Sequence, residues 1–390
     1  MSRVDELIAE LCAEGVRYIS LGDLEDAGRI KLGRGMVISK TTLAEKPGIY
    51  PVYSSSAAGT GEFGRYAEYM FDDERITWSV DGGGRFFYRE AHKYSVTNVS
   101  GWLKVNDDSI VTRYLFFVLD NAWLTKKFDY TKKAHPSVIR NEYRIPIPPL
   151  KVQREIVRIL DSFTELEAEL EAELEARKKQ YEYYRNELLG NDGENLLLSD
   201  VSDFQNGFAF KSSKFRSKGK SILRITNIQD ESIDLSKLVY FKIEDYKENL
   251  DRYRASHGSI LIAMSGATTG KVGVFRGASP VYINQRVGRF IPKPNKINSS
   301  YLFHYLSSKK NYLYNAAGGG AQPNLSTESI KNLQIVVPNL TEQERIASIL
   351  NNLHKLTTDI SEGLPAELAA RRKQYEYYRN KLLTFKELEV

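Results

Sequence analysis

The stretch RKKQYEYYRNELL (177–189) returns almost unchanged as RRKQYEYYRNKLL (371–383), with eleven of the thirteen positions identical. Upstream of each copy, IPIPPLKVQREIVRIL (145–160) and IVVPNLTEQERIASIL (335–350) share the pattern Pro-x-Leu-x-x-Gln-x-x-Ile-x-x-Ile-Leu. The repeat is about 190 residues long, far beyond the roughly 20 to 50 residues of solenoid repeats. We therefore predict a globular domain followed by a helix, duplicated once.

Each copy predicts a long helix that begins just after its prolines. In the first copy, apolar residues follow Pro148-Pro149 at the 3-4 spacing of a coiled-coil seam, at Ile156, Ile159, Phe163, Leu166 and Leu170. Three tandem Glu-Leu-Glu-Ala units (165–176) continue that helix. In the second copy, Gly363 and Pro365 interrupt the same pattern and predict a break or kink.

The stretches that precede the two helices are predicted to be β-rich. Runs of β-branched and aromatic residues bounded by Gly and Ser, such as RITWSVDG (75–82) and SILIAMSG (259–266), are typical of strands. A helix is expected late in each domain, over residues 112–128 and near residues 299–310. We predict an α+β fold with β-rich domains at 1–150 and 191–340 and helical spacers at 151–190 and 341–390. The internal symmetry favours an antiparallel coiled coil of the two helices, related by a pseudo-two-fold axis.

Composition sets the broad class of the protein. The 390 residues are 42% hydrophobic and 27% charged, which indicates a soluble globular chain of two or three domains. Cys12 is the single cysteine, so an internal disulfide and a multi-cysteine metal site are excluded. The acidic N-terminal segment, and the lack of any apolar run of about 18 residues, argue against secretion and membrane spanning. We expect a cytoplasmic protein.

Catalytic motifs are incomplete. SGATTGKVG (265–273) resembles a phosphate-binding P-loop, but Ser265 stands where the first glycine is required and Val272 where Ser or Thr is required. The residues around Pro148-Pro149 lack the polar and aromatic neighbours of an adenine methyltransferase motif. The five histidines show no metal-ligand spacing, and His304, within the apolar YLFHYL, is expected in the core. No catalytic residue, metal or cofactor is therefore expected.

The charge is distributed unevenly along the repeat. Residues 1–150 carry 20 basic and 20 acidic side chains, whereas residues 191–340 carry 20 basic and 12 acidic ones. The first helical segment (151–190) is acidic, with 7 basic and 10 acidic residues, and the second (341–390) is neutral. This distribution predicts nucleic-acid contact by the domains and protein contact by the helices.

Two glycine-containing loops follow strands at equivalent places in the repeat, VDGGGR (80–85) and SGATTGK (265–271). Small residues let backbone N–H groups approach phosphates, while a basic side chain supplies charge or a base contact. The candidate contact residues are Gly83, Arg85, Lys132 and Lys133 in the first domain and Ser265, Thr268, Thr269, Lys271, Asn284, Arg286, Gln322 and Asn324 in the second. A tight turn that needs positive φ explains either glycine loop equally well. Helix capping by Asn324 or Ser326 is nearly as good an explanation of GGGAQPNLS (318–326).

Taken together, these motifs resemble the specificity (S) subunit of type I restriction-modification systems, over essentially the whole chain. The resemblance rests on the two proline-led helix starts, the GATTGK loop, GGGAQPNLS, and the two helices that end in the YEYY motif. It implies a non-catalytic subunit in which two target-recognition domains each read one half of a bipartite double-stranded DNA site. It also implies that the helices space the domains and dock two methyltransferase (M) subunits, and that ATP-consuming restriction (R) subunits join the complex.

The resemblance places the partner interface on the helices, with Gln153, Tyr181, Tyr184, Gln343, Tyr375 and Tyr378 as the candidate residues. The chain departs from a perfect repeat at HPSVIRN (135–141), which stands where the second copy has QPNLS, and at Pro338-Asn339, which replaces Pro-Pro. The alternative interpretation is a duplicated β-rich scaffold that binds proteins through its domains and coiled coil and has no role on DNA.

Overall fold

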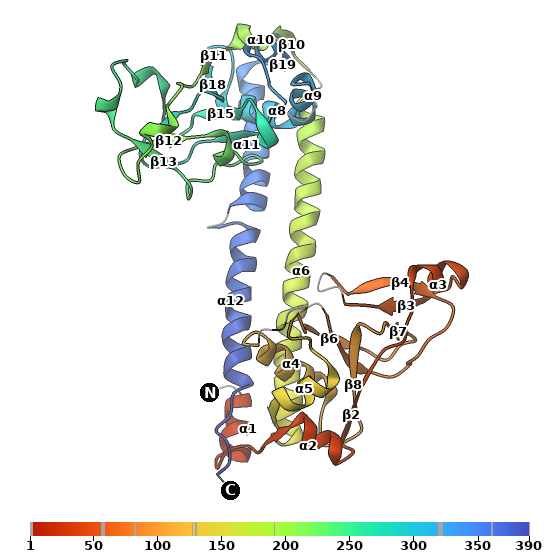
Figure 1. The fold of residues 1–390 in the computed structure, drawn as a ribbon. Helices are drawn as coiled ribbons and strands as arrows, with labels where there is room; N and C mark the ends of the chain where they lie inside the picture. The colour runs from red at the N-terminus through yellow and green to blue at the C-terminus, as the bar shows by residue number, and fades with distance from the viewer. Residues whose placement is uncertain are drawn as a thin grey trace. The chain divides into compact units, whose positions relative to one another are not determined.

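The computed structural model describes residues 3–55, 59–81, 83–126, 128, 131–190, 192–318, 323–359 and 362–389. The chain forms two compact units (Figure 1). Unit 1 comprises Met1–Leu170 and Leu368–Val390, and unit 2 comprises Glu171–Glu367. Each unit therefore contains one β-rich domain together with parts of the long helices.

Unit 1 is built on two sheets. The larger, antiparallel sheet has the order β2-β8-β5-β6, formed by β2 (Ile30–Arg34), β8 (Ser100–Val105), β5 (Arg75–Ser79) and β6 (Phe86–Arg89). The smaller sheet has the order β4-β3-β7, formed by β4 (Glu62–Tyr66), β3 (Tyr50–Tyr53) and β7 (Ser95–Val96), with β3 and β7 parallel. A separate strand pair joins β1 (Tyr18–Ser20) to β9 (Arg144–Pro146). The helices of this domain are α2 (Leu21–Asp26), α3 (Lys40–Glu45), α4 (Thr112–Trp123) and α5 (Pro136–Glu142).

The core of unit 1 lies between its larger sheet and α4. All five residues of β5 are buried, although RITWS alternates strictly between polar and apolar residues. Since successive side chains of a strand point to opposite faces, Ile76 and Trp78 share one face and the buried polar side chains of Arg75, Thr77 and Ser79 share the other. Trp78 is 1% exposed, and its indole N–H donates to the carbonyl of Ala134 at 2.7 Å. This bond satisfies the polar group that a buried tryptophan brings into a core.

Unit 2 repeats this topology with one additional strand, β14, in its second sheet. Its larger sheet has the order β11-β18-β15-β16, formed by β11 (Ser202–Asn206), β18 (Val287–Pro292), β15 (Ile260–Ala263) and β16 (Val272–Val274). Its second sheet has the order β13-β12-β17-β14, formed by β13 (Val239–Phe241), β12 (Lys220–Leu223), β17 (Val281–Ile283) and β14 (Arg254–Ala255), with β12 and β17 parallel. The remaining elements are β10 (Glu194–Leu197), β19 (Gln334–Val337), α7 (Leu198–Val201), α8 (Ser299–Ser308), α9 (Lys310–Ala316), α10 (Thr327–Lys331) and the short turns η1 (Ser212–Lys214), η2 (Ile225–Asn227), η3 (Ile243–Asp245), η4 (Asp251–Tyr253) and η5 (Gly266–Thr268). The predicted duplication of a β-rich domain is confirmed.

The helix starts and the predicted break are also confirmed. α6 (Leu150–Leu188) begins directly after Pro149, and its 39 residues include the three Glu-Leu-Glu-Ala units. The second helix is divided into α11 (Leu340–Thr358) and α12 (Leu364–Leu382). A side chain at Gly363 would meet the carbonyl of Lys355 at 2.7 Å, so the chain can turn there only with glycine. Pro365 lies in the first turn of α12, where the missing N–H does no harm.

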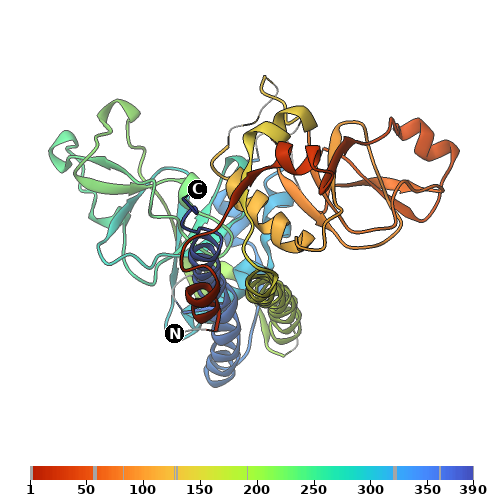
Figure 2. The ribbon, with the colours of Figure 1, turned by 90° about the horizontal axis from the view of Figure 1, so that it is seen from below.

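Within unit 1, α12 packs antiparallel to the first part of α6. Phe163 of α6 stacks on Tyr378, with ring centroids 5.5 Å apart, and Glu167, one turn later, pairs with Arg372 at 2.7 Å. Because the contact moves backward along α12 as it moves forward along α6, the two helices run in opposite directions. α1 (Arg3–Leu11) lies beside the end of α12 (Figures 1 and 2), where Asp5 pairs with Lys381 at 3.0 Å.

Candidate nucleic-acid interface

Three loops of unit 2 meet at one end of its larger sheet. The N–H of Met264, after β15, donates to the carbonyl of Arg286 at 2.9 Å, and the N–H of Leu325 donates to the carbonyl of Met264 at 2.7 Å. Ser265 and Asn324 form an antiparallel bridge. These backbone contacts hold segments 264–271, 284–286 and 323–326 together, so residues that are up to 62 positions apart in the sequence share one surface.

Arg286 and Asn324 form the exposed centre of this surface. The guanidinium of Arg286 donates through Nη1 to Oδ1 of Asn324 at 3.1 Å, and the backbone of Asn324 is held by the carbonyl of Ala317 at 3.0 Å. Within the described part of the chain, neither Arg286 nor the half-buried Lys271 forms an ion pair with a carboxylate. A pre-oriented arginine with free donors matches the O6 and N7 edge of guanine, and an unpaired lysine suits a phosphate.

The two threonines of the GATTGK loop have structural roles. Thr269 is 3% exposed, and its hydroxyl contacts the carbonyls of Gly266 at 2.7 Å and of Pro323 at 3.3 Å. The hydroxyl of Thr268 donates to the carbonyl of Ile225 at 3.0 Å. The buried Thr269 is therefore not available to DNA, and its side chain instead fastens the loop to segment 323–326. Gly266 and Gly270 have φ of 76° and 80°, so this loop does contain the tight turn considered as the alternative.

Three other residues of unit 2 were considered from the sequence: Asn284 and Gln322 as DNA contacts and Ser326 as a helix cap. Asn284 is half-buried, and its side-chain oxygen accepts from the N–H of Gln285 at 2.9 Å, which shapes the turn between β17 and β18. Ser326 caps α10 by accepting from the N–H of Ser329 at 2.9 Å, so the capping alternative is correct for this residue. Gln322 lies outside the described residues.

The β5–β6 loop of unit 1 is equivalent to the GATTGK loop of unit 2. It is a tight turn whose backbone is hydrogen-bonded within the fold. Gly83 and Gly84 have φ of 91° and 76°, and the indole of Trp123 donates to the carbonyl of Gly83 at 2.6 Å. Arg85 lies over the ring of Phe87, 5.4 Å from its centroid. The connection between β7 and β8 carries Val99 where the matching connection of unit 2 carries Arg286. At the position of the exposed Arg286, unit 1 therefore has a valine, and its exposed arginine in this region is Arg85.

Lys132 and Lys133 of unit 1 are already paired with acidic residues. Lys132 contacts Glu142 at 2.6 Å, and Lys133 contacts Asp81 at 2.9 Å. Exposed pairs of this kind contribute only about 0 to 1 kcal/mol, so a phosphate could replace either carboxylate. The pairs nevertheless cancel most of the local positive charge that a DNA contact by these lysines was expected to use.

Gln153 and Gln343 lie inside the fold and not on a docking surface, because they are 0% and 1% exposed. The side-chain oxygen of Gln153 accepts from the N–H of Val111 at 2.9 Å, and its Nε2 donates to the carbonyls of Ser109 and Pro148. Gln343 makes the equivalent contacts to Asn298, Lys296 and Pro338. Since Val111 and Asn298 precede the first turns of α4 and α8, each glutamine ties the start of a long helix to the helix that covers the sheet.

The tyrosines of the YEYY motif also divide by exposure. Tyr181 is 5% exposed and its hydroxyl is 2.9 Å from Nδ1 of His304, whereas Tyr184 is 40% exposed. Tyr375 and Tyr378 are half-buried against Phe163. The most exposed tyrosines are a pair at equivalent repeat positions that was not predicted, Tyr183 at 61% and Tyr377 at 63%.

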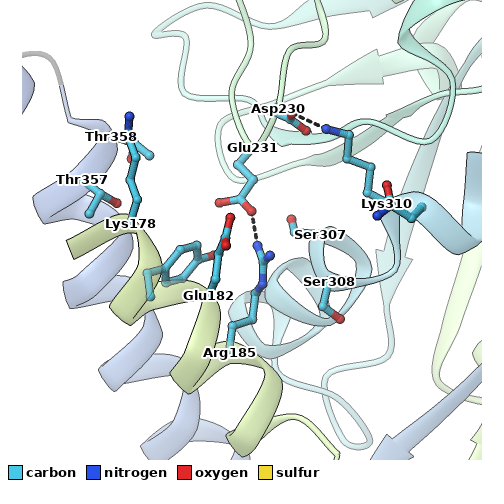
Figure 3. A pocket seen from close by; sticks show the side chains of 12 residues that line it. Lys178, Glu182, Arg185, Asp230, Glu231, Ser307, Ser308, Lys310, Thr357 and Thr358 are labelled. Carbon is cyan, nitrogen blue, oxygen red and sulfur yellow. Dashed lines mark hydrogen bonds and ion pairs between the residues drawn. The ribbon is translucent and has the colours of Figure 1, made fainter. Parts of the chain in front are cut away.

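A buried polar network in unit 2 joins the β-rich domain to the helices (Figure 3). Glu231 lies in the turn after η2 with a left-handed backbone, φ 59°, and its carboxylate contacts Arg185 of α6 and Nε2 of His354 of α11, the latter at 3.1 Å. Burial acts to raise the pKa of Glu231, but the close approach of His354 and the charge of Arg185 lower it more, so the group stays ionised. His304 is fully buried, as predicted, and burial lowers its pKa to about 4.

The network was not predicted from the sequence, and the reason differs between Arg185 and Glu231. Arg185 has an equivalent at Arg379, which is 8% exposed, so the repeat did carry a signal for a buried arginine. Glu231 has no such signal, because its partners lie 46 and 123 positions away in other elements. In unit 1, burial raises the pKa of Asp120, although the positive charges of Arg379 and Arg85 act to lower it.

Two further observations concern metal binding and membrane spanning. Among them, no group of three or more His, Cys, Asp or Glu side chains is placed to hold a metal ion. No helix in the described ranges has the length and apolar character needed to cross a membrane.

Comparison with known proteins agrees with the repeat. The family described as type I restriction modification DNA specificity domain matches residues 14–176 and 191–370. A putative type I specificity subunit from Mycoplasma pneumoniae is 30% identical over 369 residues, covering 92% of this chain and 96% of the relative. The EcoR124I/EcoR124II specificity subunit from Escherichia coli is 32% identical over 307 residues, covering 73% of this chain and 74% of the relative. In fold, the chain is similar to the crystal structure of a type I restriction-modification S subunit from M. genitalium, with a TM-score of 0.63, 16% identity, and coverage of 95% and 96%.

Proposed function

The chain belongs to the family of type I restriction-modification DNA specificity subunits, and on that premise we propose that each β-rich domain reads one half of a bipartite DNA target. A specificity subunit recognises DNA, and catalysis belongs to the other subunits of the system. The observation that carries the proposal is the repeated strand order, in which the β5–β6 and β15–β16 loops occupy the same place in each unit. A scaffold without a DNA role would not explain Arg286, which lies exposed in the β17–β18 turn beside that loop in unit 2 and forms no ion pair within the described residues.

For the partners, we propose that two methyltransferase subunits dock on the helices and that restriction subunits join the assembly. The exposed tyrosines support this, because Tyr183 and Tyr377 present large aromatic surfaces at equivalent places in the repeat. Tyrosine is enriched among the residues that dominate binding energy at protein interfaces. Gln153 and Gln343 are left out of this proposed surface because they are buried.

Exchange of residues 1–150 for the corresponding domain of another specificity subunit tests the two-reader proposal. One half of the methylated target should change completely while the other half stays the same, because each domain carries its own loops. Sequencing of methylated adenines in cells that express the chimaera with its methyltransferase partner measures this. A change in both halves would show that the domains do not read independently.

Deletion of one Glu-Leu-Glu-Ala unit, residues 169–172, tests whether α6 sets the distance between the half-sites. Four residues shorten a helix by about 6 Å, which corresponds to roughly two base pairs of B-DNA. We expect the spacer between the half-sites to shorten by one or two base pairs with both half-sites retained. An unchanged spacer in the methylation pattern would contradict the proposed role of α6.

A further inference from the structure

The connection between β11 and β12, up to the first residue of β12, is a basic segment. It lies outside the three loops at 264–271, 284–286 and 323–326, which are called the reading loops below. Lys211, Lys214, Arg216, Lys218 and Lys220 fall within ten residues, and no acidic residue occurs between positions 204 and 229. The equivalent connection of unit 1, residues 35–49, contains two lysines and one glutamate. The basic segment therefore belongs to one half of the repeat only.

The backbone of the basic segment is fixed to the domain. The N–H of Lys211 donates to the hydroxyl of Tyr246 at 3.0 Å, and the N–H of Arg216 donates to the carbonyl of Tyr240 at 2.8 Å. Lys220 is in register with Phe241 in the β12–β13 ladder. Beneath the segment lies a cluster of buried apolar side chains formed by Phe210, Ile222, Phe241, Leu250 and Tyr282. The basic side chains thus project from a rigid support, which lowers the entropy lost when they bind a ligand.

Most of the positive charge of the segment is uncompensated. Lys211, Lys218 and Lys220 are exposed, and within the described residues they form no ion pair. Arg216 reaches Asp245 only at 3.5 Å, and Lys214 contacts the backbone carbonyl of that residue. In unit 1, by contrast, Lys46, Lys132 and Lys133 are each paired with a carboxylate.

The distance between the basic segment and the reading loops is close to the width of the DNA major groove. Asn284, at the loop end, donates its N–H to the carbonyl of Leu223 at the end of β12, whereas Lys220 begins that strand. Three strand residues span roughly 10 Å, close to the ~12 Å width of the DNA major groove. β12 and β13 also lie on the side of unit 2 away from α6 and α11 (Figure 1), so the helices do not cover the segment.

We propose that Lys211, Lys218 and Lys220, supported by Arg216, contact the phosphates that flank the groove read by Arg286 and Lys271. This inference rests on the proposed function of unit 2 as a DNA reader. Phosphate contacts fix the register of a protein on the duplex and provide affinity without sequence preference. An acidic protein surface is a weaker match, because lysine is depleted at protein–protein interfaces.

The test is a triple variant, Lys211→Ala with Lys218→Ala and Lys220→Ala, in the full chain assembled with its methyltransferase partner. The dependence of DNA affinity on salt concentration should become shallower, with the slope of log K against log salt reduced by about 2.7, or ~0.9 per lost phosphate contact. Target and scrambled duplexes should lose affinity equally, and the methylated sequence should not change. The matching Lys→Arg triple variant should retain the original slope.

The control is Lys237→Ala with Lys296→Ala and Lys331→Ala, which removes the same charge from exposed lysines elsewhere in unit 2. If both triple variants reduce the slope equally, the effect is one of net charge and the proposed surface is wrong. If DNA affinity is unchanged but assembly with the methyltransferase subunit weakens, the surface docks protein. If the unmodified complex shows no preference for any duplex sequence, the proposed function itself fails, and that outcome is distinct from the other two.

Discussion

An Arg286→Ala, Lys271→Ala double variant should bind its target duplex about 10- to 100-fold more weakly than the unmodified chain at physiological salt. A bidentate arginine–guanine contact contributes roughly 1 to 3 kcal/mol of discrimination, and loss of a phosphate contact adds a salt-dependent term. Because Arg286 is held by Asn324 and has no carboxylate partner in the described residues, its removal should leave the fold intact. Fluorescence anisotropy of labelled duplexes, with the chain assembled with its methyltransferase partner, measures the change.

The pattern of methylation separates this site from a general effect of charge. The half-site read by unit 2 should become less specific, while the half-site read by unit 1 should not change. Arg276→Ala is the matched control, since Arg276 is an exposed arginine that follows β16 whereas Lys271 precedes it. Equal losses of affinity in the control and the double variant would remove these loops from the proposed interface.

A Glu231→Gln variant should lower the free energy of unfolding of unit 2 by about 3 kcal/mol. Removal of one member of a buried ion pair leaves the other charge without compensation, which typically costs about 3 to 5 kcal/mol. The side chains of Glu231 and Arg185 are 16% and 13% exposed, so water compensates little of the loss. Urea unfolding gives the free energy, and hydrogen exchange of residues 181–189 and 228–233 shows where the structure has loosened.

Glu182→Gln is the control for this prediction. Glu182 lines the same hollow as Glu231 (Figure 3), but it is exposed and forms no ion pair with any residue that the structure describes, so its replacement should change stability by no more than about 0.5 kcal/mol. An Arg185→Met, Glu231→Met double variant should recover part of the loss, because apolar replacement of a buried pair is often neutral. If Glu231→Gln were as mild as Glu182→Gln, the network would not be what holds the domain against the helices.

The fold could be predicted from the sequence largely because the signals for the main elements occur in both copies of the repeat. Pro149 marks the start of α6, and Gly363 with Pro365 marks the break between α11 and α12; both signals act through local backbone geometry, which a sequence shows directly. The detailed strand order could not be obtained this way, since it depends on pairings between distant segments such as β2 with β8.

The candidate site was predicted less well than the fold. The sequence named Lys271, Arg286 and Asn324 as separate candidates for DNA contact, and the structure brings their three loops together; their contact with DNA stays a prediction. Sequence could not separate Lys271, which is free of ion pairs in the described residues, from Thr269, whose hydroxyl is used inside the fold. It also could not show that Gln153 is buried, because a glutamine that accepts from Val111 and donates to Ser109 and Pro148 looks the same in the sequence as an exposed one.

The discontinuity of unit 1 has a consequence for synthesis of the chain. Its core combines Val4 and Ile156 with Leu382 and Leu383, whereas unit 2 is one contiguous stretch from Glu171 to Glu367. A contact between such distant positions cannot form on the ribosome until the last helix has emerged, and it closes a long loop when it does. The domain that is translated first is therefore completed last, after the one that follows it can already have folded.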